Sequence, residues 1–141
     1  MFDMKIPELK NILFTTTLSV RIYDVNYGNH LGHDSLISLL HEARMRFLKS
    51  MGYSEIDIQQ VGILITSLAV NYLSEAFFAD NLVINIGIGE KTRTSLELLY
   101  QVINENSKKI VANAITTITF YDYRNKKVSK IPEEFMVRVD S

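Results

Sequence analysis

The sequence predicts an α+β domain in which one long helix lies against a five- to six-stranded antiparallel sheet. One segment of the chain has helical periodicity, and several others alternate apolar and polar residues with a period of two. The alternating segments follow one another and are joined by short turns, which is typical of antiparallel pairing. No repeat, linker or low-complexity stretch divides the chain, so we expect residues 1–141 to form a single domain.

The strands are expected where the alternation is clearest. The first covers residues 12–22, where every second residue except Thr16 is apolar. Residues 23–33 are rich in Gly, Asn and Asp and are expected to form a loop. Further strands are expected over residues 62–72, 82–88, 96–102 and 110–121, with turns at 104–108 and 122–126 and a short tail after Pro132.

The helix is expected over residues 34–51, because its leucines and the apolar residues that follow them recur at helical spacing. We expect Asp34 or Ser35 to accept the free N–H groups of the first turn, and Gly52 to end the helix. One helix cannot cover both faces of such a sheet. Because both faces of the strand at 110–121 carry apolar residues, we expect a second subunit on the other face.

The composition excludes several classes of function. With 15 basic and 16 acidic side chains, the chain lacks the positive excess that nucleic-acid binding needs. The absence of cysteine excludes disulfides, zinc–cysteine sites and a cysteine nucleophile. No segment approaches the roughly 18 uninterrupted apolar residues of a membrane helix, and the N-terminus has no signal-peptide pattern. We therefore expect a cytoplasmic protein without a metal site and without nucleic acid or membrane as a partner.

The loop and the start of the helix carry the most specific pattern. Arg21, Asp24, Asn26 and His30 stand at spacings that resemble the signature of acyl-CoA thioesterases related to 4-hydroxybenzoyl-CoA thioesterase. That signature runs arginine, two residues, Asp-x-Asp, three residues, then His and usually Val-Asn-Asn. The resemblance continues through Glu42-Ala43-Arg44, Phe47-Leu48, residues 71–76 and residues 80–82, and covers roughly residues 12 to 135.

This resemblance implies the hot-dog fold, in which the sheet wraps around the helix, and a thioester hydrolase that cleaves an acyl-CoA or acyl-carrier-protein substrate. It also implies a homodimer, or a homotetramer made of two such dimers, with the acyl group beside the helix at the dimer interface. Coenzyme A enters only as part of the substrate, and no other cofactor is expected.

The physical chemistry of thioester hydrolysis points to the same region as the reaction site. A helix N-terminus carries unsatisfied N–H groups and a partial positive charge, which can polarise a thioester carbonyl and stabilise its oxyanion. The expected donors are the backbone N–H groups near Gly32, His33 and Asp34. Gly32 also lets a ligand approach the backbone closely.

One position departs from the family's pattern. The catalytic aspartate of 4-hydroxybenzoyl-CoA thioesterase falls on Asn26, and an amide cannot take a proton from water near neutral pH. The base is then expected to be Asp24, Glu42, His30, or a group such as Glu75 of the partner chain. Plant acyl-carrier-protein thioesterases resemble this chain in a local Asp-x-Asn, although their His follows sooner. The family's Val-Asn-Asn is replaced here by residues 31–33.

Each of these candidates also has a structural interpretation. Asp24 could cap backbone N–H groups of the loop, and Asn26 could simply tolerate a left-handed backbone. His30 could hold the loop by hydrogen bonds, and Glu42 could form a salt bridge with Arg46, four residues on.

Four residues of the strands and turns are candidates for contact with the substrate. Lys91 and Arg93 could meet the phosphates of coenzyme A, or be charged only because turns are solvated. Ser67 and Ser95 could line the pocket, or be ordinary strand residues.

Hydrolysis of an acyl thioester is the function that the pattern favours. A non-hydrolytic acyl-thioester binding module is the main alternative, because the expected aspartate is absent. A hot-dog hydratase or dehydratase is a further alternative, but the acid–base motifs of those enzymes are not evident here.

Overall fold

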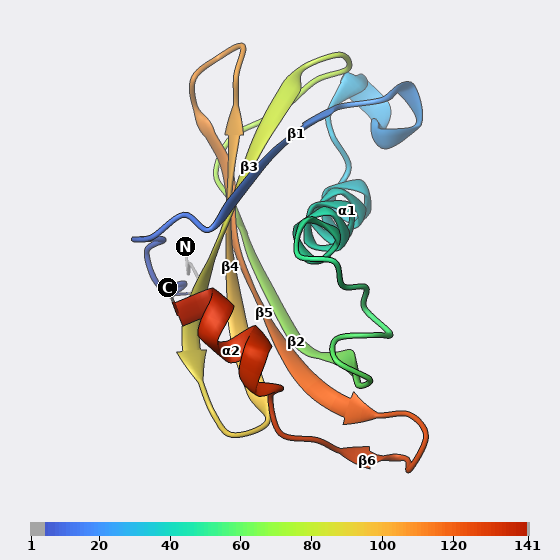
Figure 1. Ribbon diagram of the computed structural model, residues 1–141. Coiled ribbons are helices and arrows are strands. Elements are labelled where there is room, and N and C mark those ends of the chain that lie inside the picture. The colour runs from blue at the N-terminus through green and yellow to red at the C-terminus, as the bar shows by residue number, and fades with distance from the viewer. Residues whose placement is uncertain (1–4, 141) are drawn as a thin grey trace.

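The computed structural model describes residues 5–140 and contains a curled antiparallel sheet with α1 in its concave face (Figure 1). The strand order is β1-β3-β4-β5-β2, and β6 pairs with β5. This confirms the predicted fold class. The elements are β1 (Phe14–Ser19), 3-10 turns at Ile22–Asp24 and Tyr27–Asn29, α1 (His33–Ser50), β2 (Gly62–Tyr72), β3 (Asn81–Lys91), β4 (Ser95–Asn104), β5 (Ile110–Asp122), β6 (Lys127–Val128) and α2 (Glu133–Asp140).

The hydrophobic core fills the space between α1 and the concave face of the sheet. The apolar stripe of α1 is buried along its whole length, from Leu36 to Leu48. Opposite it, every second residue of β5 from Ala112 to Phe120 is buried, as the period of two requires. The helix ends as expected, because Gly52 has a positive φ of 83°.

The first strand is shorter than predicted. It ends at Ser19 instead of Ile22, and Ile22 is 63% exposed. The Asp24 carboxylate accepts the Arg21 backbone N–H at 2.8 Å and pairs with the Arg21 guanidinium at 3.0 Å. These contacts turn the chain away from the sheet, so the apolar alternation outlasts the strand.

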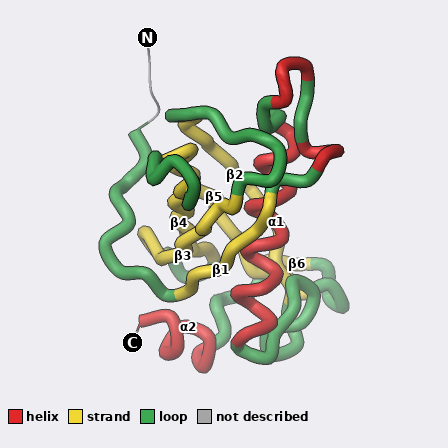
Figure 2. Tube along the Cα trace, turned by 90° about the horizontal axis from the view of Figure 1, so that it is seen from above, coloured by secondary structure: helices red, strands yellow, loops and turns green. Residues whose placement is uncertain are grey.

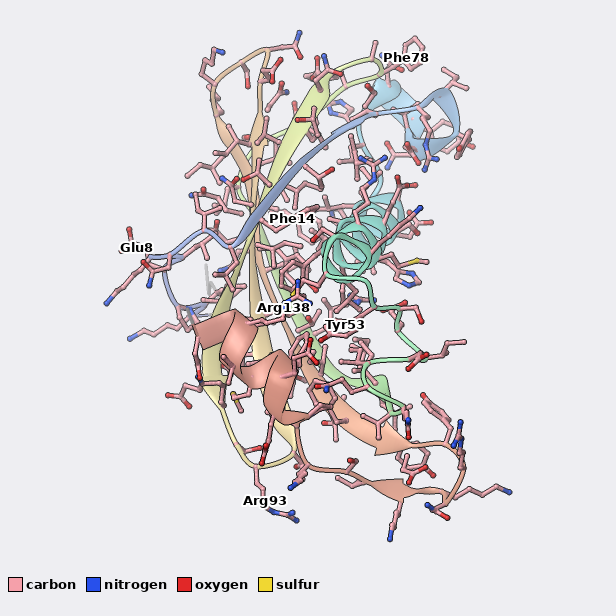
Figure 3. The ribbon with its side chains drawn as sticks, in the orientation of Figure 1. Glu8, Phe14, Tyr53, Phe78, Arg93 and Arg138 are labelled. Carbon is pink, nitrogen blue, oxygen red and sulfur yellow. The ribbon has the colours of Figure 1, made fainter. Side chains whose placement is uncertain are left out.

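The short tail expected after Pro132 is wrong, because residues 133–140 form the helix α2. Its Phe135 is buried, with its ring 5.5 Å from that of Phe120 and 6.0 Å from that of Tyr53. Pro132 therefore precedes a helix instead of ending the ordered chain. The guanidinium of Arg138 donates to the carbonyl of Met51 at 2.8 Å, which holds α2 beside the end of α1 (Figure 3).

Residues 8–12 pack over β3 on the face of the sheet that α1 leaves uncovered. Figure 2 shows α1 on one side of the strands and the N-terminal segment on the other. Gly87 of β3 is buried there, and a Cβ at this position would overlap Leu9. The outward residues of β5 are half-buried. Within the described residues a single chain therefore covers this face in part, and the second subunit expected there stays a prediction.

The β2 edge of the sheet is long and apolar. All 11 residues of β2 are uncharged, and three large side chains of this strand, Leu64, Ile65 and Leu68, are about two-fifths exposed. Such an edge presents unpaired backbone groups to another strand, and soluble proteins usually protect it with charges or proline. No helix among residues 5–140 has the length and hydrophobicity to cross a membrane.

Candidate active site

A pocket of about 430 Å³ lies at the N-terminus of α1. It is bounded by the loop that enters the helix, by the first turn of the helix, and by the segment that leaves β2. Its lining includes Asn26, His30, Leu31, Gly32, His33, Leu36, Tyr72, Ser74, Glu75 and Val111.

Backbone hydrogen bonds bring these three segments together. The loop closes on itself, because the Asn26 N–H donates to the His30 carbonyl at 2.9 Å. The loop is then tied to the segment after β2, because the Leu31 N–H donates to the Ala76 carbonyl at 2.8 Å. Gly28 permits the turn, since its φ is +81° and a Cβ there would lie 2.8 Å from the His30 ring.

The helix begins without a side-chain cap. Its N-cap residue is Gly32, and no side chain among residues 5–140 accepts a hydrogen bond from the first turn. The predicted capping by Asp34 or Ser35 is therefore wrong. The Gly32 N–H donates to the Asp24 carbonyl at 2.9 Å and is not available to a ligand. Among residues 5–140, the N–H groups of His33, Asp34 and Ser35 have no acceptor. The expected donor set therefore loses Gly32 and gains Ser35.

The side chain of Asn26 lies beside these donors. Its Nδ2 atom is 3.9 Å from the point that a Cβ on Gly32 would occupy. The residue is exposed and lines the pocket. No residue of the described chain hydrogen-bonds to its amide. The amide is therefore free to bind water or a substrate oxygen.

His30 and Glu75 form a pair on the rim of the pocket. The His30 Nδ1 lies 3.3 Å from a Glu75 carboxylate oxygen, and the His30 ring packs against Phe77 at 5.0 Å. We expected Glu75 from a partner chain, but it reaches this pair from the same chain. The Glu75 side chain is 66% exposed, so water can reach its carboxylate.

Asp24 and Glu42 lie outside the pocket. Each has the structural role that the sequence offered as the alternative to a catalytic one. The Asp24 side chain is 3% exposed, and its oxygens are occupied by Arg21. Glu42 forms a salt bridge with Arg46 at 2.7 Å. Arg46 also donates to the Thr16 hydroxyl at 2.8 Å, which ties α1 to β1.

The four predicted contact residues on the strands do not line the pocket of their own chain. Ser67 donates to the Thr117 hydroxyl at 2.7 Å, and the Ser95 hydroxyl lies 2.8 Å from that of Thr119. Lys91 forms an ion pair with Asp140 of α2. Arg93 is at the tip of the β3–β4 hairpin, at the opposite end of the sheet from Phe78 of the segment after β2 (Figure 3).

Tyr72 is a pocket residue to which the sequence assigned no role. Its ring stacks on the His33 imidazole, with centroids 3.9 Å apart and an interplanar angle of 20°. Burial, followed by the negative charge of Asp34, raises the pKa of Tyr72 above its ordinary value. The hydroxyl therefore stays protonated across the physiological pH range. An aromatic residue at the end of a strand is a weak signal, since most such residues belong to a core.

A second polar cluster lies beneath the C-terminal half of α1. The Arg44 guanidinium is buried and donates to Glu55 at 2.7 Å and to the Tyr100 hydroxyl at 3.2 Å. His41 contacts the other Glu55 oxygen at 2.6 Å. Burial opposes ionisation of Glu55, but the hydrogen bonds from Arg44 and His41 outweigh it and hold the pKa of Glu55 below its ordinary value. This cluster is separate from the pocket, and it fastens the segment after α1.

The sequence and the fold together are those of a thioesterase-like protein. The model of the thioesterase-like superfamily matches residues 20–139, and the chain belongs to this superfamily. No curated protein sequence matches the chain.

Solved structures confirm the hot-dog fold. The 1,4-dihydroxy-2-naphthoyl-CoA thioesterase from Synechocystis has a TM-score of 0.81 and 18% identity, over 91% of this chain and 96% of that chain. A gentisyl-coenzyme A thioesterase has a TM-score of 0.77 and 20% identity, over 89% of this chain and 98% of that chain. A Staphylococcus aureus protein in complex with CoA has a TM-score of 0.82 and 18% identity, over 96% of this chain and 86% of that chain.

Proposed function

We propose that the protein hydrolyses an acyl thioester of coenzyme A or of a carrier protein to the free acid and the thiol. One observation carries this proposal: His33, whose N–H group in the first turn of α1 has no acceptor among residues 5–140, lines one pocket together with Asn26 and the His30–Glu75 pair. Membership of the thioesterase-like superfamily supports the same reaction.

The carbonyl oxygen of the thioester lies at the helix N-terminus, where the N–H groups of His33, Asp34 and Ser35 stabilise the oxyanion that forms. A water molecule held by Asn26 attacks the carbonyl carbon. Its oxygen forms the new C–O bond, and its proton passes to a base. The tetrahedral intermediate then breaks its C–S bond, and the departing thiolate takes up a proton.

Glu75 is the base that fits this pocket best. Asn26 has no basic site, and Asp24 and Glu42 are occupied by Arg21 and Arg46 away from the pocket. The Glu75 carboxylate is open to water, and the His30 Nδ1 lies 3.3 Å from one of its oxygens. The proton of the attacking water therefore passes to Glu75, with His30 as its positioning partner.

The active unit is a homodimer formed by the β2 edges of two chains. The long, uncharged, partly exposed β2 strand supports this pairing. In an antiparallel β2–β2 pair the partner's sheet is inverted, so its β3–β4 end lies toward the α1 N-terminus. This is the arrangement in which Lys91, Arg93, Ser67 or Ser95 could serve the site of the other chain. Pairing of dimers into a tetramer and the cytoplasmic location stay predictions.

The experiment that tests the activity measures free-thiol release over a panel of short-chain, long-chain and aromatic acyl-CoAs. The parent should release thiol from at least one member, and Asn26→Ala should lower kcat by at least ~10²-fold if this amide holds the attacking water. Tight binding of acyl-CoA without turnover of any member would replace hydrolysis by the binding-module function, for which the missing aspartate is the supporting observation.

A further inference from the structure

We propose that a groove next to the pocket, defined here as the arm groove, receives the phosphopantetheine arm of the substrate, with Lys109 in contact with a phosphate. The inference rests on the proposed function, because it names the part of an acyl thioester that lies outside the acyl pocket. The arm groove has a volume of about 380 Å³ and lies between the segment after β2 and the β4–β5 turn. Its lining includes Ser74, Glu75, Phe77, Asn106, Ser107 and Lys109.

The arm groove adjoins the candidate active site. Ser74 and Glu75 line both the pocket at the α1 N-terminus and the arm groove. A thioester whose carbonyl lies at the helix N-terminus must lead its thiol substituent out of the pocket. The arm groove begins at Ser74 and at Glu75, the proposed base. It therefore offers this exit within one chain.

Hydrogen bonds hold the groove wall in place before any ligand arrives. Asn104 is 2% exposed, and its side-chain oxygen accepts the Asn106 N–H at 2.9 Å. Its amide nitrogen donates to Asp80 at 2.8 Å, and Asp80 also accepts the Phe77 N–H at 3.0 Å. The Asn106 side chain accepts the Asn81 N–H at 3.0 Å. The two walls are thus linked by hydrogen bonds around the buried Asn104 side chain, so less of the groove has to become ordered when a ligand binds.

The chemistry of the lining matches an arm that is neutral along most of its length and anionic at its end. Amide and hydroxyl side chains suit the two amide groups of pantetheine, and the half-exposed Phe77 ring suits its methylene groups. Two carboxylates also line the groove: Asp80 is engaged by Asn104, and Glu75 lies at the pocket end. Lys109 is the one cation in the lining, and its ammonium group has no partner among residues 5–140.

The experiment compares Lys109→Ala with the parent on one acyl group carried by three thiols: coenzyme A, a carrier protein, and N-acetylcysteamine, which lacks the phosphate. Lys109→Ala should raise KM for the CoA thioester at least about tenfold, as expected for loss of a charge-assisted phosphate contact. KM for the N-acetylcysteamine thioester and kcat should stay within about twofold of the parent, and Lys109→Arg should restore KM. The carrier-protein thioester shows which phosphate Lys109 contacts. If KM for this thioester rises as much as KM for the CoA thioester, Lys109 contacts the 4′-phosphate. If KM for the carrier-protein thioester does not rise, Lys109 contacts the nucleotide end of coenzyme A.

Lys108→Ala is the matched control, because Lys108 is the neighbouring exposed lysine and does not line the groove. Equal effects of the two alanine variants would reduce the role of Lys109 to net charge and overturn the inference. An unchanged KM in Lys109→Ala, or a large rise in Arg93→Ala instead, would also overturn it while leaving the proposed hydrolysis intact. If the parent turns over no thioester, titration with coenzyme A still decides, because only Lys109→Ala should weaken its binding.

Discussion

Replacing Glu55 by Gln is expected to destabilise the protein more than replacing its partner Arg44 by Met. The Arg44 side chain is 8% exposed, whereas that of Glu55 is 22% exposed. The Glu55→Gln change leaves a buried guanidinium without a counter-charge and with only neutral acceptors. Removing one partner of a buried ion pair costs about 3–5 kcal/mol, and the partial exposure of Glu55 places this variant at the lower end, about 3 kcal/mol.

The Arg44→Met change has a smaller expected cost, about 1–2 kcal/mol. Glu55 keeps its contact with His41 at 2.6 Å and can reach water, and the Tyr100 hydroxyl keeps its 2.8 Å contact with Thr116. Urea unfolding of both single variants and of the double variant measures the two costs and their coupling energy. A larger loss of stability in Arg44→Met than in Glu55→Gln, or two costs that simply add in the double variant, would contradict this prediction.

Three further predictions concern acid stability, the loop and the β2 edge. The pKa of Glu55 is lower in the folded state than in the unfolded state, so its ionised form stabilises the fold above the unfolded-state pKa. This stabilisation should be lost as the pH falls below about 4.5. Glu55→Gln should therefore flatten the pH dependence of the free energy of unfolding in that range. Gly28→Ala and Gly52→Ala should each lower the free energy of unfolding by about 1 kcal/mol, because both glycines have positive φ. Only Gly28→Ala should also lower kcat, because only there would a Cβ displace the His30 ring. Equal activity of the two variants would count against a role of His30 in the reaction. Leu68→Lys should convert the dimer to monomers, as measured by light scattering, and abolish activity, as measured by thiol release. Val128→Lys, the control at another exposed strand position, should change neither the oligomeric state nor the activity. Active monomers would contradict the proposed interface.

The helix and most of the sheet could be predicted from the sequence, because each element has a long and regular pattern. The exceptions depend on contacts that no local pattern contains. The strand β1 ends early because the Asp24 carboxylate binds Arg21. The helix α2 has only one buried pair, Phe135 and Val139, and its formation depends on packing against Phe120.

The candidate site divides in the same way. Asn26 and His30 could be placed at the helix N-terminus, because the loop leads directly into the helix. The position of Glu75 could not be derived, because it depends on the backbone contact between Leu31 and Ala76, which lie far apart in the sequence. Nor could the pattern distinguish a pocket-facing Glu42 from one paired with Arg46, since both interpretations place it on the same helix.

The central claim is that Glu75 supplies the base that Asn26 cannot. Thiol release by Glu75→Gln tests it most directly, with Glu42→Gln as the matched control, since both glutamates are accessible to solvent but only Glu75 lines the pocket. We expect Glu75→Gln to lower kcat by at least ~10²-fold with little change in KM, and Glu42→Gln to retain the parent rate. Full activity in Glu75→Gln, or a comparable loss in Glu42→Gln, would contradict the proposed mechanism.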